Sequence, residues 1–159
     1  MKNQIETWSL DREIVLAKLL NHPRDKVFAA WTNPDALAKW YGPEGLDIET
    51  KEADIREGGV WRFDMVGTFE GKPQRFENHV RFLEIVPNER IVMDYGTPDP
   101  NDPERFRMTV TFDEQSDGKT VVTLRQLHPT RERRLAVIGF GAVEYGLQTL
   151  DGLAVWLDG

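Results

Sequence analysis

The sequence predicts an α+β domain in which a curved antiparallel sheet of six to seven strands wraps around one long C-terminal helix. Two observations carry this prediction. The last stretch of the chain has one apolar stripe at helical spacing, formed by Ala136, Phe140, Val143, Leu147, Leu150, Ala154 and Leu157. Most of the chain before it consists of predicted strands joined by short turns, which is typical of an antiparallel sheet. We expect residues 1–159 to form a single domain.

The first predicted element is a strand, the apolar run at residues 13–20. Two short helices are expected after it. Residues 24–31 carry apolar side chains one helical turn apart, and Asn33-Pro34 both ends that helix and starts the next one. Gly42-Pro43 then stops the second helix.

Six further stretches alternate between apolar and polar side chains, with turn residues between them. They cover residues 46–55, 60–66, 74–85, 90–95, 105–113 and 120–127. One face of the resulting sheet is mostly apolar, so we expect the long helix at residues 131–159 to cover it. Gly139 and Gly141 mark a candidate break in that helix and leave Val143–Leu157 as its firm part.

Composition and charge exclude several classes of function. The net charge of −7 disfavours nucleic acid and anionic membranes as partners. The chain has no cysteine, which excludes disulfides, thiolate metal sites and cysteine nucleophiles. No apolar run reaches the roughly 18 residues of a membrane span, and Met1 to Asp11 lacks the apolar segment of a signal peptide. We therefore expect a cytoplasmic protein.

The sequence offers little that would support catalysis. No nucleotide-binding loop or nucleophile motif is present, and the three histidines lack the spacing of metal ligands. We therefore expect no catalytic residue, no metal site and no cofactor. The acid–base candidates for a cavity are His128, Glu144, Tyr95 and Tyr145.

The apolar sheet face is rich in aromatic residues and methionine. It is interpreted either as a packed core or as the lining of a pocket. Methionine suits adaptable apolar space, and polar side chains such as Asn78 and Gln126 fall on the same face, as in small-molecule sites. The residues expected to line a ligand pocket are Trp61, Phe63, Met65, Phe76, Asn78, Met93, Tyr95, Phe106, Met108 and Tyr145.

Several motifs together resemble a known family. They are Val27–Pro34, Trp40–Pro43, Arg56–Gly59 followed by Trp61-Arg62-Phe63, and Leu83–Ile91. In order and spacing they resemble the SRPBCC (START-like, helix-grip) superfamily and, within it, the family of the activator of the heat-shock protein 90 ATPase. The resemblance covers nearly the whole chain. It implies the helix-grip fold and a cavity between the sheet and the long helix, which takes apolar small molecules across the superfamily.

Three functions follow as expectations. The leading one is binding of an apolar or amphipathic small molecule without dedicated catalysis. The family name suggests an alternative, a protein-interaction role that stimulates a chaperone ATPase. The second alternative is a cyclase- or dehydratase-like enzyme that uses acid–base residues in the cavity. A homodimer is also open, because the edge strands of a curved sheet invite pairing.

Overall fold

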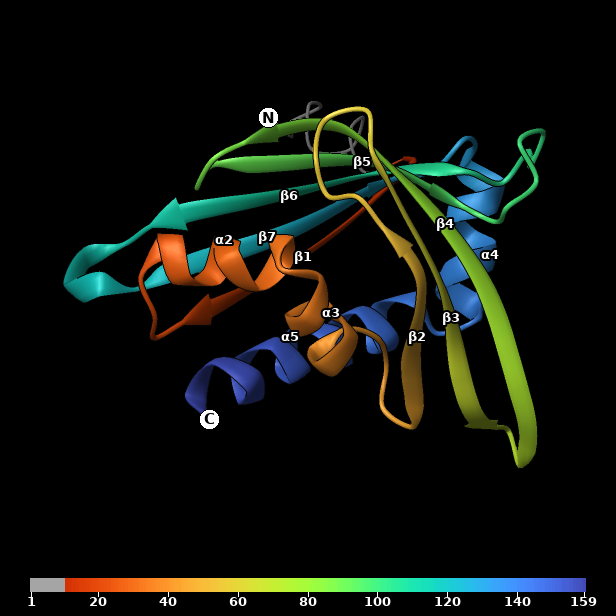
Figure 1. Cartoon of the computed structure of the whole chain (residues 1–159). Helices are drawn as coiled ribbons and strands as arrows, with labels where there is room; N and C mark the ends of the chain where they lie inside the picture. Colours follow the sequence, from red (N-terminus) through yellow and green to blue (C-terminus); the bar gives the residue numbers. More distant parts are fainter. Residues whose placement is uncertain (1–10) are drawn as a thin grey trace.

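Figure 1 shows the computed structural model of the chain, which is described for residues 11–159. The expectation that Met1 to Asp11 carries no signal peptide therefore lies almost wholly outside the described residues. The elements are β1 (Glu13–Leu20), α2 (Arg24–Thr32), α3 (Pro34–Trp40), β2 (Leu46–Ala53), β3 (Val60–Phe69), β4 (Lys72–Val86), β5 (Arg90–Gly96), β6 (Phe106–Glu114), the short turn η1 (Ser116–Gly118), β7 (Thr120–Leu127), α4 (Arg131–Gly139) and α5 (Ala142–Asp158). Their order is the predicted one.

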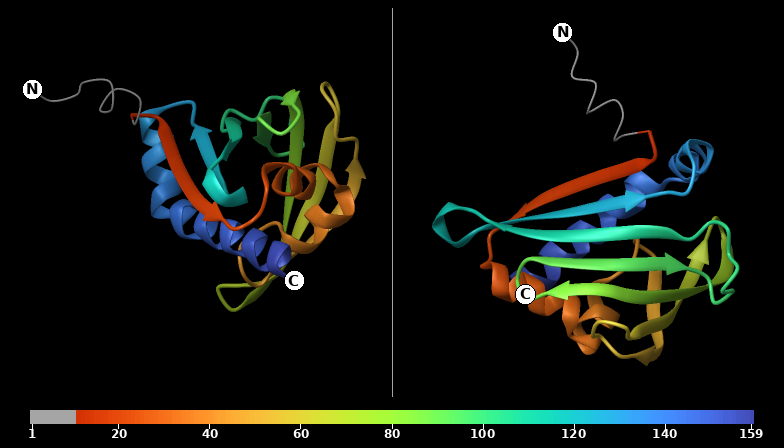
Figure 2. Two further views of the ribbon diagram at one scale, coloured as in Figure 1. Left: turned by 90° about the vertical axis from the view of Figure 1, so that its left-hand side faces the viewer. Right: turned by 90° about the horizontal axis from the view of Figure 1, so that it is seen from above.

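The strands form one seven-stranded antiparallel sheet of order β1-β7-β6-β5-β4-β3-β2. Strands β2 to β7 follow one another as a meander, and β1 pairs with β7 from Glu13 opposite Leu127 to Leu20 opposite Thr120. Figure 2 shows the sheet curling so that α5 runs across its concave side. The predicted helix-grip architecture is confirmed, with seven strands.

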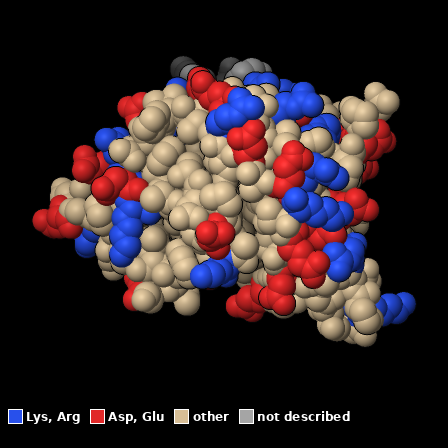
Figure 3. All heavy atoms as spheres, in the orientation of Figure 1, with Lys and Arg blue, Asp and Glu red and all other residues tan. Residues whose placement is uncertain are grey.

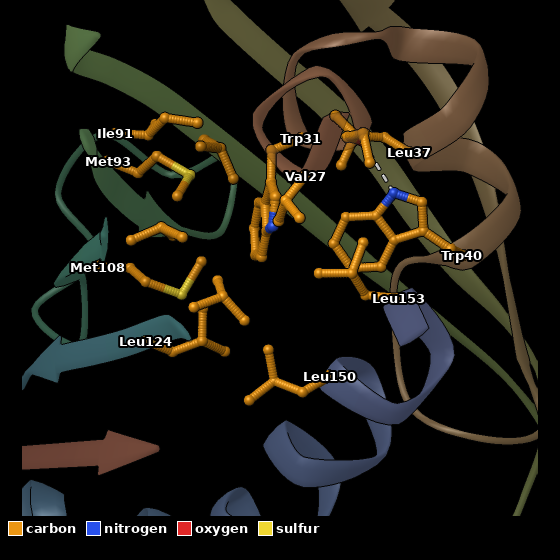
Figure 4. Packing of buried hydrophobic residues seen from close by; sticks show 14 of the residues in the cluster. Val27, Trp31, Leu37, Trp40, Ile91, Met93, Met108, Leu124, Leu150 and Leu153 are labelled. Carbon is orange, nitrogen blue, oxygen red and sulfur yellow. Dashed lines mark hydrogen bonds between the residues drawn. The ribbon is translucent and has the colours of Figure 1, made fainter. Parts of the chain in front are cut away.

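The two short helices are fixed by local chemistry at Asn33. Its side-chain oxygen accepts hydrogen bonds from the backbone N–H groups of Asp35 (2.9 Å) and Ala36 (3.3 Å), which caps α3 as predicted. The indole N–H of Trp40 donates to the carbonyl of Ala30 at 2.9 Å and ties α3 to α2 (Figure 4). The two helices therefore pack against the core as one unit.

The hydrophobic core lies under the second half of α5. Leu150 and Leu153 of this helix are fully buried. Figure 4 shows them gathered around Trp31 of α2, together with Met93 and Met108 from the neighbouring strands β5 and β6. The C-terminal turns of α5, the two short helices and the sheet thus pack as a conventional core.

The long C-terminal stretch is broken, as the sequence predicts. α4 ends at Gly139, and Gly141 adopts a left-handed conformation (φ 98°) before α5 begins. Such a backbone conformation favours glycine. None of the residues of α4 is buried, and the first buried residue of α5 is Thr149. The corner between the two helices therefore covers a part of the sheet that the core does not fill.

The convex sheet face is polar, but one of its carboxylates is buried. Asp64 of β3 is 1% exposed and pairs with Arg75 at 2.6 Å and with Lys51 at 3.2 Å. Burial raises the pKa of Asp64, but the hydrogen bonds from Arg75 and Lys51 outweigh burial and lower that pKa. Figure 3 shows charged side chains of both signs gathered over the side of the molecule that β2, β3 and β4 form.

Candidate functional site: a pocket under the helix corner

A pocket of about 400 Å³ lies between the concave sheet face and the corner of α4 and α5. Seven of the ten predicted residues line it: Met65, Phe76, Asn78, Tyr95, Phe106, Met108 and Tyr145. The lining also includes Tyr41, Pro43, Leu46, Phe69, Gln126, Val137, Phe140 and Ala142. The structure therefore brings most of the predicted residues together, in one end of the concave face.

The other three predicted residues belong to the core. Trp61, Phe63 and Met93 are almost fully buried and do not line this pocket. The rings of Trp61 and Phe63 stack with their centroids 3.8 Å apart, and the indole N–H of Trp61 donates to Thr50 at 3.2 Å. Alternation along a strand identifies the face on which a side chain lies. It does not identify which end of that face the helix leaves open.

One wall of the pocket is a short stack of rings. The ring of Phe106 lies parallel to that of Tyr95, with centroids 5.1 Å apart and planes at 19°. On the side of β7, the ring of His128 lies 4.8 Å from that of Phe106. Flat aromatic surfaces of this kind favour stacking with flat apolar ligands.

The mouth of the pocket is also aromatic. Phe69, near the tip of the β3–β4 hairpin, meets Phe76 and Tyr145 edge-on, with centroids 5.9 and 5.5 Å away. Phe140 at the end of α4 is 70% exposed although it lines the pocket. An apolar residue that lines a pocket and is also exposed marks the opening to solvent.

Two tyrosine hydroxyls meet deeper in the pocket. Tyr41 donates a hydrogen bond to Tyr95 at 3.4 Å. Burial raises the pKa of Tyr41 to about 12, although the hydrogen bond with Tyr95 opposes this shift. Burial, together with Tyr41, raises the pKa of Tyr95 well above 10. Both hydroxyls therefore stay protonated near neutral pH and can donate or accept hydrogen bonds.

The pocket has two further polar groups, both amides. Asn78 donates from its side-chain nitrogen to the carbonyl of Phe76 at 3.0 Å. The amide oxygen of Gln126 lies 3.2 Å from Nε2 of His128. All the residues that line the pocket in the described part of the chain have uncharged side chains at neutral pH.

The acid–base candidates do not converge in this pocket. Tyr95 and Tyr145 line it, whereas Glu144 is exposed on α5 and His128 lies behind Phe106. Within residues 11–159, no group of three acidic or histidine side chains could hold a metal ion. None of the helices in this range is long and apolar enough to cross a membrane.

Some lining residues were missed for identifiable reasons. Phe69 continues the alternation of β3 and could have been found by extending the predicted strand beyond residue 66. Gly67 lies in β3 two residues before Phe69. A Cβ added to Gly67 would stand 2.1 Å from the carbonyl oxygen of Gly45. Gly67 therefore lets the loop after α3 approach the sheet. The loop residues Tyr41 and Pro43 line the pocket because the loop lies close to the sheet. No local sequence pattern predicts this contact.

Solved structures of several bacterial proteins share this architecture. A protein from Chromobacterium violaceum is 28% identical with a TM-score of 0.74, and the match covers 93% of this chain and 98% of that one. A protein from Nitrosomonas europaea is 23% identical with a TM-score of 0.80, covering 93% and 95%. The AHSA1 protein from Silicibacter pomeroyi is 21% identical with a TM-score of 0.70, covering 92% and 97%.

A search of curated protein sequences gave no match. The family model described as Activator of Hsp90 ATPase homolog 1-like protein matches residues 21–158, which is most of the chain. This match covers the motifs that run from Val27 to Ile91 and continues through both C-terminal helices. The chain therefore belongs to the Activator of Hsp90 ATPase homolog 1-like family, within the helix-grip superfamily that its motifs predict.

Proposed function

We propose that the protein binds an apolar or amphipathic small molecule in the pocket under the α4–α5 corner. The observation that carries this proposal is the lining itself, in which aromatic and methionine walls surround a few convergent, uncharged polar groups. Small-molecule sites have this composition, and the pocket volume of about 400 Å³ falls in their usual range of about 300–1,000 Å³.

Helix α4 is suited to cover a bound molecule. It has no buried residue, and three of its arginines attach it to the rest of the fold. Arg131 forms an ion pair with Asp11 at 3.9 Å. Arg133 forms an ion pair with Glu104 at 3.0 Å, and Arg134 donates to the backbone carbonyl of Glu13 at 2.7 Å. Val137 and Ile138 of α4 pack, partly buried, against the core. A ligand would therefore bury apolar surface against both the sheet and this helix. Each Å² of apolar area removed from water contributes about 25 cal/mol to binding.

Native mass spectrometry of the purified protein tests this proposal directly. A bound molecule appears as extra mass that leaves on denaturation, and that mass begins its identification. Protein that purifies without a ligand is then screened by thermal shift against lipids and neutral aromatic compounds. Stabilisation by at least one class is expected because ligands that bind only the folded state raise its stability. Absence of both the extra mass and any thermal shift would contradict the proposal.

A second candidate is contact with a chaperone, which the family description suggests. The observation in its favour is a pair of exposed apolar side chains, Leu135 on α4 and Phe140 directly after it. An ATPase assay with a heat-shock chaperone would support this role if the protein stimulates hydrolysis and Leu135→Ser abolishes the stimulation. Stimulation that survives Leu135→Ser and Phe140→Ser would count against this surface.

A further inference from the structure

His128 is held against the back of the pocket wall. It follows β7 directly and is 2% exposed. Its backbone N–H donates to the carbonyl of Arg12 at 2.9 Å, and its ring packs against Phe106. Its Nε2 lies 3.2 Å from the amide oxygen of Gln126, whereas Nδ1 has no hydrogen-bond partner among the described residues.

This environment selects one form of the His128 ring. Burial lowers its pKa to about 4, and the positive charges of Arg133 and Arg134 contribute, so the ring is neutral near pH 7. A neutral ring carries one N–H. With the hydrogen on Nε2, His128 donates to Gln126 and only a lone pair is unpartnered. The other form would leave a buried N–H without a partner, which is the less common and costlier defect.

The chosen form fixes the orientation of the Gln126 amide. Its oxygen accepts from His128, so its nitrogen and two N–H donors are turned away from that ring. No hydrogen bond within residues 11–159 engages this nitrogen, and Gln126 lines the pocket. Gln126 therefore supplies an N–H donor that has no partner among the described residues. Asn78 supplies the opposite group, because its nitrogen donates to Phe76 and its amide oxygen accepts no hydrogen bond from the described residues.

The rest of the lining disfavours an ionised ligand. A buried carboxylate or ammonium group loses its hydration and needs a counter-charge, which the described lining lacks. The parallel rings of Tyr95 and Phe106 favour a flat aromatic body instead. Charge and shape thus restrict the ligand independently of the amide.

We infer that Gln126, oriented by His128, donates a hydrogen bond to an acceptor oxygen of the ligand. The pocket then selects uncharged aromatic molecules that carry such an oxygen, such as aryl ketones, over aromatic carboxylates and over aromatics without oxygen. This inference rests on the proposed ligand-binding function and adds the chemical class of the ligand to it.

Three probes that share one ring system test the inference. They are 2-acetylnaphthalene, 2-ethylnaphthalene and 2-naphthoate, titrated by calorimetry at pH 7.5. The preference is the Kd for the ethyl compound divided by the Kd for the ketone. This ratio should fall about three- to tenfold in Gln126→Met, which is similar in length but cannot donate. The solvation of the probes cancels when wild type and variant are compared. The charged naphthoate should bind most weakly to both.

Two further variants complete the design. His128→Leu should lower the same ratio in part, because the amide is then free to turn. Gln115→Leu in the exposed turn after β6 should leave the ratio unchanged. Retained binding of 2-ethylnaphthalene reports that each variant is folded. If Gln126→Met no longer binds 2-ethylnaphthalene, Gln126→Leu is used in its place.

The outcomes separate the two proposals. A ratio that stays unchanged in Gln126→Met, or naphthoate binding as tight as that of the ketone, would overturn the inference while leaving ligand binding intact. If neither uncharged probe binds to the wild type, the inference fails for these ligands, and a negative native-mass and thermal-shift screen would then remove the proposed function as well.

Discussion

The carbonyl oxygen of Trp40 lies against Gly152 of α5, where an added Cβ would stand only 2.9 Å away. Through this contact, the C-terminal end of α3 packs against α5. From the sequence alone, a glycine inside a helix is a cost of about 1 kcal/mol relative to alanine. In the structure, Gly152 is the residue that permits the two helices to approach.

Gly152→Ala should therefore destabilise the protein despite the higher helix propensity of alanine. The clash is with backbone, which cannot move aside, so we expect a loss of about 1–3 kcal/mol in the free energy of unfolding. Gly139→Ala is the matched control, because no atom lies within 4 Å of the new Cβ there. It should raise stability by up to about 1 kcal/mol. Urea unfolding measures both, and equal effects would contradict the proposed helix contact.

Filling the pocket should weaken ligand binding. Ala142 lines the pocket at the start of α5, whereas Val155 of the same helix is 72% exposed. Ala142→Trp should weaken binding of a neutral aromatic probe by about tenfold or more, because an indole occupies the volume that a ligand needs. Val155→Trp is the control and should change the affinity little. Equal losses in both variants would argue against the location of the site.

His128 should make stability depend on pH in a defined window. Its pKa falls from an ordinary 6.5 to about 4 on folding, so between these values the unfolded chain binds a proton that the folded protein does not. Stability is therefore lost as the pH drops from about 6.5 to about 4, by at most about 3 kcal/mol. The difference in unfolding free energy between wild type and His128→Gln should follow this curve. A difference that is flat with pH would show that the ring is not held neutral.

The contribution of Asp64 to the stability of the fold should depend on pH in the acid range. Because its pKa is lowered on folding, its contribution is present above its ordinary value near 3.8 and is lost as the pH falls below it. Asp64→Asn should cost about 1–3 kcal/mol at pH 7, since two charge-assisted bonds are weakened. Glu77, which is 58% exposed and 3.8 Å from Lys51, is the control. Glu77→Gln should change stability by less than about 0.5 kcal/mol.

The fold was predictable because its signals are local. Alternating side chains and turn residues identified the strands, and Asn33-Pro34 identified the boundary between the two short helices. The break after α4 followed from Gly139 and Gly141. Each of these features depends on a few neighbouring residues and was confirmed in the structure.

The site was only partly predictable because it depends on where helices cross the sheet. Phe63 and Met65 share one face of β3, yet Phe63 lies in the core and Met65 lines the pocket. Nothing in their alternation distinguishes them. The difference arises from the position of α5, whose buried residues begin at Thr149. The orientation of Gln126 likewise depends on His128, and hence on packing rather than on spacing.

The division of α5 into a half with buried leucines and a half that is at most partly buried has an evolutionary consequence. Leu150, Leu153 and Leu157 hold the fold together, whereas the first turns of the helix and α4 face the pocket. Substitutions at the partly exposed residues of α4 and of the first turns of α5 remove less of the packing that keeps the chain folded than substitutions at the buried leucines do. A lineage built on this scaffold can therefore change what it recognises by a series of single substitutions, each of which leaves a folded protein for selection to act on.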